Sequence, residues 1–301
     1  MSPSFTHILN PFVCPPDSEH GIASRVTYAS LTHALEHAKA AGLAVEINAI
    51  VKPGDETAVC PPARLVARLA RTVQDIRPLK PVRPLPLIGD ILQAGAASSN
   101  ASHMVFTNMD IAVRPDFYVQ LAALITQRFD DATPFIVYRR NIPARYTDPG
   151  QLPAMYAEPG ERAYGFDCFV FPRALLNNLD LGTSCVGAAH FDYLMFMALD
   201  AASGFRIQRV GDLPLTFHLG NDIAWSGQID YIEHNLNEAL SAIARMRARH
   251  AVPDDSPFAR LERGHFRPNA RLDSVWLRKL KRLPGVAPIA LHAKRWLGRS
   301  H

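Results

Sequence analysis

The sequence predicts an α/β domain in which a mostly parallel central sheet is flanked by helices. Short apolar runs alternate with segments whose apolar residues recur at helical spacing, and the connections between them are short. Of the 301 residues, 48% are hydrophobic and 20% are charged, a composition that can bury a sizeable core and argues against a disordered protein. Polar side chains follow several apolar runs, which is where open parallel sheets bind ligands.

Strands and helices alternate in the first third of the chain. Leu31, Leu35 and Ala38 share one helix face, and Gly42 is placed to cap that helix. The predicted strands lie at 6–12 and 43–51, and the predicted helices at 25–41 and 87–97. A further helix is expected to begin at Pro61-Pro62, with an apolar stripe formed by Leu65, Leu69, Val73 and Ile76. The proline-rich residues 77–86 are expected to form an extended connection.

The rest of the chain continues this pattern around one long loop. The apolar run at 103–107 predicts a strand, and Pro115 blocks its continuation. Prolines make 141–161 loop-like, and loops of that length in a compact domain are usually functional or disordered. The other predicted elements are helices at 116–129, 190–199 and 228–247 and strands at 134–139, 164–173, 205–210 and 215–219.

Neither a membrane span nor a secretory signal is evident. No run of 18 or more apolar residues occurs, and the N-terminal residues lack a basic region followed by an apolar one. The four cysteines lie far apart and form no C-x-x-C pair, so we expect reduced, mostly buried thiols rather than a zinc site or a disulfide framework. These features predict a cytoplasmic protein.

The basic residues are concentrated at the C-terminus. Residues 271–301 contain eight Lys or Arg and one acidic residue, Asp273, and carry a net charge of +7, whereas the remaining chain carries −3. A mildly acidic body argues against a nucleic-acid partner. The tail also contains Trp276 and Trp296, and two interpretations fit: a basic amphipathic segment on an anionic membrane at the inner face, or a terminal helix packed on the domain.

Asn108 and Asp110 directly follow the predicted strand at 103–107. Side chains two apart on an extended segment point the same way, so both can meet one metal ion or one diphosphate. An ordinary Asx turn explains the same spacing. His218 ends a later apolar strand; it is either a structural histidine or, beside Asp110, part of a mixed nitrogen and oxygen site for a divalent cation.

Two further carboxylates are candidates for catalysis. Asp192 lies at the start of the predicted helix at 190–199. Its negative charge either simply interacts favourably with the helix dipole, or the side chain faces the same cleft and acts as a general base. Asp167 lies near the start of the predicted strand at 164–173.

The order of these segments resembles that of glycosyltransferases of the GT-A type, over roughly residues 6–225. The segment TNMDIAVRPDFY resembles the family's D-x-D region, with Asn108 in place of the first aspartate. GFDCFVFPR resembles the acceptor-side segment, HFDYLMF the region that carries the base, and TFHLGND the late histidine of the metal site. The resemblance implies a GT-A-like (Rossmann-like) catalytic domain at 1–250, with a nucleotide-binding half at 1–113 and an acceptor half at 114–250. A basic helical extension would occupy 251–301.

This resemblance implies a metal-assisted transfer of sugar from a UDP- or GDP-sugar to a hydroxyl of a glycan or lipid-linked acceptor, in polysaccharide or glycoconjugate synthesis. Mn²⁺ or Mg²⁺ held by Asp110 and His218 would stabilise the leaving diphosphate. Asp192 is the first candidate for the base and Asp167 the second. Arg25 is either a ligand of the nucleotide or a solvated charge at the helix end.

Two alternatives remain at this stage. A nucleotidyltransferase would use a similar sheet, although the segment after the first strand lacks a glycine-rich basic loop. A non-catalytic sugar- or partner-binding protein on a degenerate scaffold is favoured by Asn108, because an amide oxygen is a weaker ligand for a hard cation than a carboxylate.

Overall fold

A computed structural model describes residues 2–163, 165–220 and 228–266. Among these residues, the central sheet has seven strands, in the order β10 (Gln208–Val210), β6 (Phe135–Val137), β9 (Cys168–Pro172), β4 (His103–Thr107), β1 (Phe5–Leu9), β2 (Val45–Val51) and β3 (Arg64–Arg68). Only β9 runs antiparallel to its neighbours, β4 and β6. The predicted α/β class with a mostly parallel sheet is therefore confirmed.

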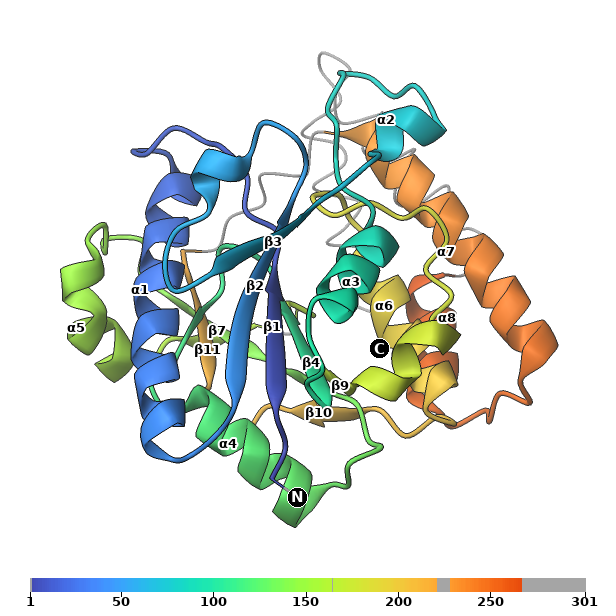
Figure 1. The fold of residues 1–301 in the computed structure, drawn as a ribbon. Helices are drawn as coiled ribbons and strands as arrows, with labels where there is room; N and C mark the ends of the chain where they lie inside the picture. The colour runs from blue at the N-terminus through green and yellow to red at the C-terminus, as the bar shows by residue number, and fades with distance from the viewer. Residues whose placement is uncertain (1, 164, 221–227, 267–301) are drawn as a thin grey trace, which may run out of the picture.

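Helices cover both faces of this sheet (Figure 1). One face packs against α1 (Glu19–Ala40) and α4 (Phe117–Ala123), and the other against α3 (Ile88–Ala97), α6 (Phe191–Ala202) and α7 (Ile229–Arg249). The strands alternate between the two cores: in β4, Met104 and Phe106 join the second core and Val105 joins the first. Since successive side chains of a strand point to opposite faces, a strand buried on both sides is apolar throughout.

A smaller sheet lies beside the central one. Its order is β5 (Ala112–Val113), β11 (Thr216–Leu219), β7 (Arg139–Ile142) and β8 (Glu161–Arg162). The single strand predicted at 134–139 is thus divided between two sheets, with β6 ending at Val137 and β7 starting at Arg139. The region expected to be one loop at 141–161 contains the end of β7 and a short helix, α5 (Leu152–Ala157).

The prediction of a helix after Pro61-Pro62 is wrong. Residues Arg64–Arg68 form β3, which pairs in parallel with β2 at the edge of the sheet, and only Val73–Ile76 form a short helix, α2. The stripe of Leu65, Leu69 and Val73 fits a helical period, but pairing with the exposed edge of β2 gives the backbone of this segment hydrogen-bond partners. Helix α1 also begins earlier than predicted, because Ser18 accepts a hydrogen bond from the Gly21 amide and caps it.

The last described helix, α8 (Pro257–His265), packs on α6. No helix in the described part of the chain is long and apolar enough to cross a membrane. The tail at 271–301 lies outside the described residues, and the division of the chain at residue 250 stays a prediction.

Candidate functional site

Strand β4 and strand β9 bring Asn108 and Asp167 together. Asn108 follows β4, whereas Asp167 precedes β9; because the two strands are antiparallel, with Thr107 opposite Cys168, both residues lie at the same edge of the sheet. The Asn108 side-chain amide donates to Asp167 Oδ1 at 3.1 Å, and its backbone N–H donates to the Asp167 carbonyl at 3.4 Å.

The smaller sheet brings His218 to Asp110. In the antiparallel pair of β5 and β11, Ala112 lies opposite Phe217, so the residues just before β5 run beside the end of β11. His218 Nε2 lies 3.3 Å from Asp110 Oδ2, and the histidine side chain is buried. The pair that the sequence analysis placed at two strand ends therefore meets in space.

The environment of His218 orients its ring. Nδ1 lies 3.1 Å from the Gly220 carbonyl oxygen, and since a carbonyl only accepts, Nδ1 carries a proton and donates it. Nε2 then faces Asp110, as in histidines that bind metal through one nitrogen and are held by a carbonyl at the other.

The two groups also shift each other's pKa. Burial alone would raise the pKa of Asp110, but the hydrogen bond and charge of His218 outweigh it and lower that pKa. Burial opposes the charged form of His218, whereas Asp110 raises the pKa of the imidazole above its usual value. Asp110 therefore remains a carboxylate across the neutral range.

These residues partly fit a divalent cation. Asp110 Oδ1 is buried and has no hydrogen-bond partner among the described residues, an arrangement that costs free energy unless a further group binds there. Within the described residues, no three His, Cys, Asp or Glu side chains are grouped as a metal site. Asp110 and His218 thus fit a cation of the kind that takes its other ligands from water and substrate phosphates.

Arg139, which the sequence analysis missed, is the cation next to Asp167. Its Nη1 donates to Asp167 Oδ2 at 2.6 Å and its Nε to Asn141 Oδ1 at 3.0 Å. Only 16% of the arginine and 13% of the aspartate side chain is exposed, so the pair is screened little by solvent. The available signal was the position of Arg139 at the end of the apolar segment PFIVYR.

Asp192 lies in the first turn of α6, and its carboxyl pKa is strongly raised. Burial, and after it the negative charge of Asp167, raise the pKa of Asp192 to about 7. Burial also raises the pKa of Asp167, and the Asp110 charge adds to this, while Arg139 opposes it. The environment of Asp110 therefore favours a charged carboxylate, whereas that of Asp192 gives a carboxyl group with a pKa of about 7.

Arg25 is not joined to this group. It is exposed on α1 and donates to the Pro16 carbonyl in the segment after β1. A residue that the sequence analysis missed, His20 in the first turn of α1, lies close enough for its charge to lower the pKa of Asp110. The ring of His20 packs edge-on against Phe12 at 5.6 Å, and Phe12 is 39% exposed.

Two surface hollows differ in their relation to these residues. One of about 720 Å³ lies between α3, residues 176–182 and the end of α7, and none of the carboxylates described above lines it. Another, of about 400 Å³, is lined by Arg139, Arg140 and Arg162. The site is identified by the chemistry of its side chains, and not by the volume of a hollow.

Comparisons with known proteins add the following. No family model matches the chain, and no curated protein matches it. Its structure is similar to that of M. tuberculosis glucosyl-3-phosphoglycerate synthase, with 15% identity and a TM-score of 0.44 over 84% of this chain and 82% of that one. It is also similar to S. aureus TarS 1-349 in complex with UDP-GlcNAc, with 11% identity and a TM-score of 0.49 over 92% of this chain and 79% of that one.

Proposed function

We propose that the chain is a glycosyltransferase that moves a sugar from a nucleotide-sugar donor to an acceptor hydroxyl. The observation that carries this proposal is that two chemically different groups, Asp110 with His218 and Asp192 with Asp167, lie within electrostatic reach of each other. Asp110 and His218 offer a charged oxygen and an oriented nitrogen, while Asp192, with a pKa of about 7, lies near Asp167 at the other end. A bound cation can stabilise a departing diphosphate. A carboxyl group with a pKa near 7 can accept the proton of an acceptor hydroxyl.

The donor end of the site would consist of Asn108, Asp110 and His218. When bound there, Mn²⁺ or Mg²⁺ would supply Lewis-acid stabilisation of the negative charge that grows on the leaving diphosphate. Asp110 Oδ1, which lacks a partner, and His218 Nε2 are the protein atoms that would hold it. His20, at the start of α1, lies on the same side and suits an anionic diphosphate near a helix N-terminus.

The acceptor end would be Asp192, with Asp167 as a positioning residue. Asp192 accepts the proton of the acceptor hydroxyl while the hydroxyl oxygen forms a bond to the anomeric carbon, and the bond from that carbon to the diphosphate breaks. Asp167 is the weaker candidate for the base because Arg139 and Asn108 already occupy its two oxygens. Its remaining negative charge keeps the pKa of Asp192 high, which makes Asp192 a stronger base.

The wider setting belongs to the same proposal. The donor would be a UDP- or GDP-sugar and the acceptor a glycan or lipid-linked molecule, in polysaccharide or glycoconjugate synthesis. Within this proposal the protein is cytoplasmic, and the net charge of +7 on residues 271–301 supports contact with an anionic membrane.

Donor hydrolysis tests the proposal. UDP-, GDP- and CDP-sugars are incubated with the protein in the absence of acceptor, with Mn²⁺ or with a chelator, and free nucleotide is measured. We expect hydrolysis of at least one donor, dependent on the metal and lost in Asp110→Asn. Asp130→Asn, which changes an exposed carboxylate paired with Arg206, serves as the matched control and keeps the activity. Binding of a donor without any turnover would favour a non-catalytic binding protein, and release of pyrophosphate from a nucleoside triphosphate would favour a nucleotidyltransferase.

A further inference from the structure

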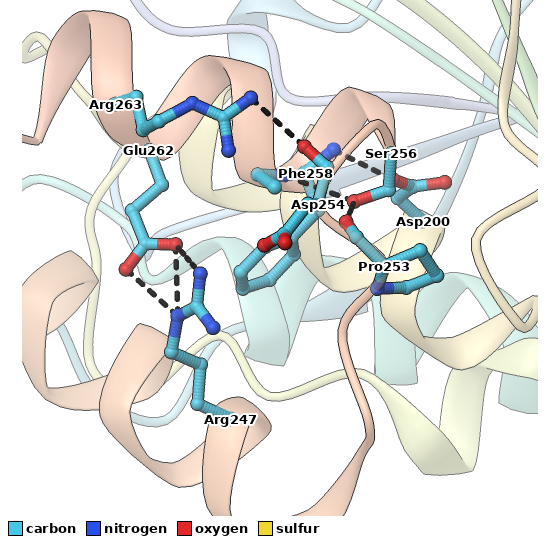
Figure 2. Close-up of polar contacts among 9 residues, drawn as sticks. Asp200, Arg247, Pro253, Asp254, Ser256, Phe258, Glu262 and Arg263 are labelled. Atoms are coloured by element: carbon cyan, nitrogen blue, oxygen red, sulfur yellow. Dashed lines mark hydrogen bonds and ion pairs between the residues drawn. The ribbon is translucent and has the colours of Figure 1, made fainter.

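Helix α8 is fixed firmly against α6 (Figure 2). Ser256 caps α8 by accepting from the Ala259 amide at 3.1 Å, and the Phe258 ring is fully buried in the core shared with α6. The Phe258 amide donates to Asp200 Oδ2 at 2.8 Å, while Asp200 Oδ1 accepts from the Ile207 amide at 3.1 Å. Because Asp200 belongs to α6 and is itself fully buried, the start of α8 has a defined position relative to α6.

A second contact fixes the remainder of α8. Arg247 of α7 makes a two-pronged ion pair with Glu262, with its shortest distance 2.6 Å (Figure 2). Anchored at both points, α8 ends beside the first turn of α6. Its last residue, His265, places its ring centroid 3.8 Å from that of Tyr193, and the following Phe266 is buried against His190 at 5.9 Å.

Tyr193 connects this aromatic contact to the proposed acceptor end. It directly follows Asp192, and its ring packs edge-on against Phe166 at 5.3 Å, next to Asp167. Burial raises the pKa of Tyr193 to about 12, and the charges of Asp192 and Asp167 add to this. The phenol therefore lies within electrostatic reach of both carboxylates, and His265, which packs on the same ring, is exposed to solvent.

We infer that Tyr193 and His265 form the wall of the acceptor subsite and that the acceptor they receive is an uncharged sugar ring. This inference rests on the proposed function. A pyranose has an apolar C–H face and a polar rim, and such a ligand suits an aromatic pair with a few polar groups directed at its hydroxyls. Packing the apolar face on the two rings leaves a hydroxyl at the rim free to meet the neighbouring carboxylate.

The charges around the subsite favour the same class of acceptor. Asp192 and Asp167 lie close enough for one to affect the ionisation of the other, and Arg139 is already paired with Asp167. An acceptor carrying a phosphate or carboxylate would meet the charged form of Asp192 without a free partner in Arg139, and like charges brought together oppose binding; Arg209, over the Phe166 ring at 5.8 Å, is the cation that could offset this repulsion. A neutral sugar avoids that repulsion.

Binding of methyl pyranosides tests the inference without requiring turnover. Saturation-transfer NMR is recorded on the full chain with UDP and Mn²⁺ present, against methyl glucoside, methyl galactoside and methyl mannoside, with 3-phosphoglycerate as the anionic comparison. We expect at least one glycoside to bind, and expect His265→Ala to weaken it about 10-fold, the order of one aromatic contact. His265→Phe should restore most of the affinity because it keeps an aromatic ring against Tyr193. His250→Ala, which removes a histidine at the end of α7 that contacts Phe205, is the matched control and should leave binding unchanged.

The outcomes separate this inference from the proposed function. In a transfer assay, His265→Ala should raise the KM for the acceptor more than it lowers kcat. The inferred acceptor subsite is refuted if glycosides bind equally well to the wild type, His265→Ala and Tyr193→Ala. It is also refuted if 3-phosphoglycerate binds in preference to the glycosides. Both conclusions hold even if donor hydrolysis is observed. Glycoside binding that depends on His265 in a protein that cleaves no nucleotide sugar supports the wall and overturns the transferase proposal alone.

Discussion

The raised pKa of Asp192 predicts a specific dependence of the transfer rate on pH. If the group that accepts the hydroxyl proton has a pKa of about 7, only its charged form is active. At pH 6 about one tenth of the molecules carry the charged form and at pH 8 about nine tenths, so kcat should rise roughly tenfold between them. A carboxylate of ordinary pKa would give a flat profile over the same range.

A substitution at Asp167 should move this profile. Burial is the main cause of the raised pKa of Asp192, and the negative charge of Asp167 is the next. Asp167→Asn keeps the shape of the side chain and removes the charge, so the midpoint of the kcat profile should shift to lower pH. The control is Asp130→Asn, at an exposed ion pair with Arg206 near the C-terminal end of α6, the end opposite Asp192, and it should leave the midpoint in place.

The assay is nucleotide release measured at saturating donor, acceptor and Mn²⁺ from pH 5.5 to 9. Saturation removes the pH dependence of binding, so the profile reports groups that act in the bound complex. A rate that stays constant down to pH 5.5 in the wild type would refute the assignment of Asp192 as the base. A midpoint near 7 that does not move in Asp167→Asn would refute the electrostatic role of Asp167.

Three further predictions concern single features of the chain. Asp192→Asn should lower kcat by about 10²–10⁴ with little change in donor KM, and near-full turnover would assign the base elsewhere. Arg139→Gln should cost about 3–5 kcal/mol in urea unfolding, because it leaves the largely buried carboxylate of Asp167 without its cation, and the loss should be smaller in the double variant with Asp167→Asn. Equal costs in the two backgrounds would show that the pair is not coupled. The full chain should sediment with anionic liposomes more than residues 1–270 do, and less so at high salt, whereas equal, negligible pelleting would favour a packed terminal helix.

The overall fold follows from local patterns that the sequence displays directly. Apolar strands buried on both faces and helices with one apolar stripe have distinct periods, so the class of fold and most elements were predicted. The edge strand β3 was missed because Leu65 and Leu69 are compatible with either period, and only pairing with β2 decides between them. Local patterns fail where the choice depends on a neighbouring strand.

The candidate site could be predicted only in part for a similar reason. Asp110 and His218 each follow or end an apolar run, which was enough to predict their pairing, although the contact itself is made by β5 and β11 of the smaller sheet, which the sequence did not predict. The direction of β9, which brings Asp167 to Asn108, and the switch between sheets that turns Arg139 toward Asp167 depend on contacts between distant segments. The contact between His265 and Tyr193 depends in the same way on how α8 docks on α6.

Binding of UDP with and without Mn²⁺ to the wild type and to Asp110→Ala tests the central claim most directly. The account predicts that Mn²⁺ strengthens UDP binding to the wild type, seen as a larger thermal shift; at a nucleotide concentration 100 times Kd the stabilisation is about 2.7 kcal/mol. Asp110→Ala should stay folded and lose the part that depends on the metal, while Asp130→Ala should keep it. UDP binding that is the same with and without Mn²⁺ in the wild type, or the same in Asp110→Ala and wild type with Mn²⁺ present, would contradict the account.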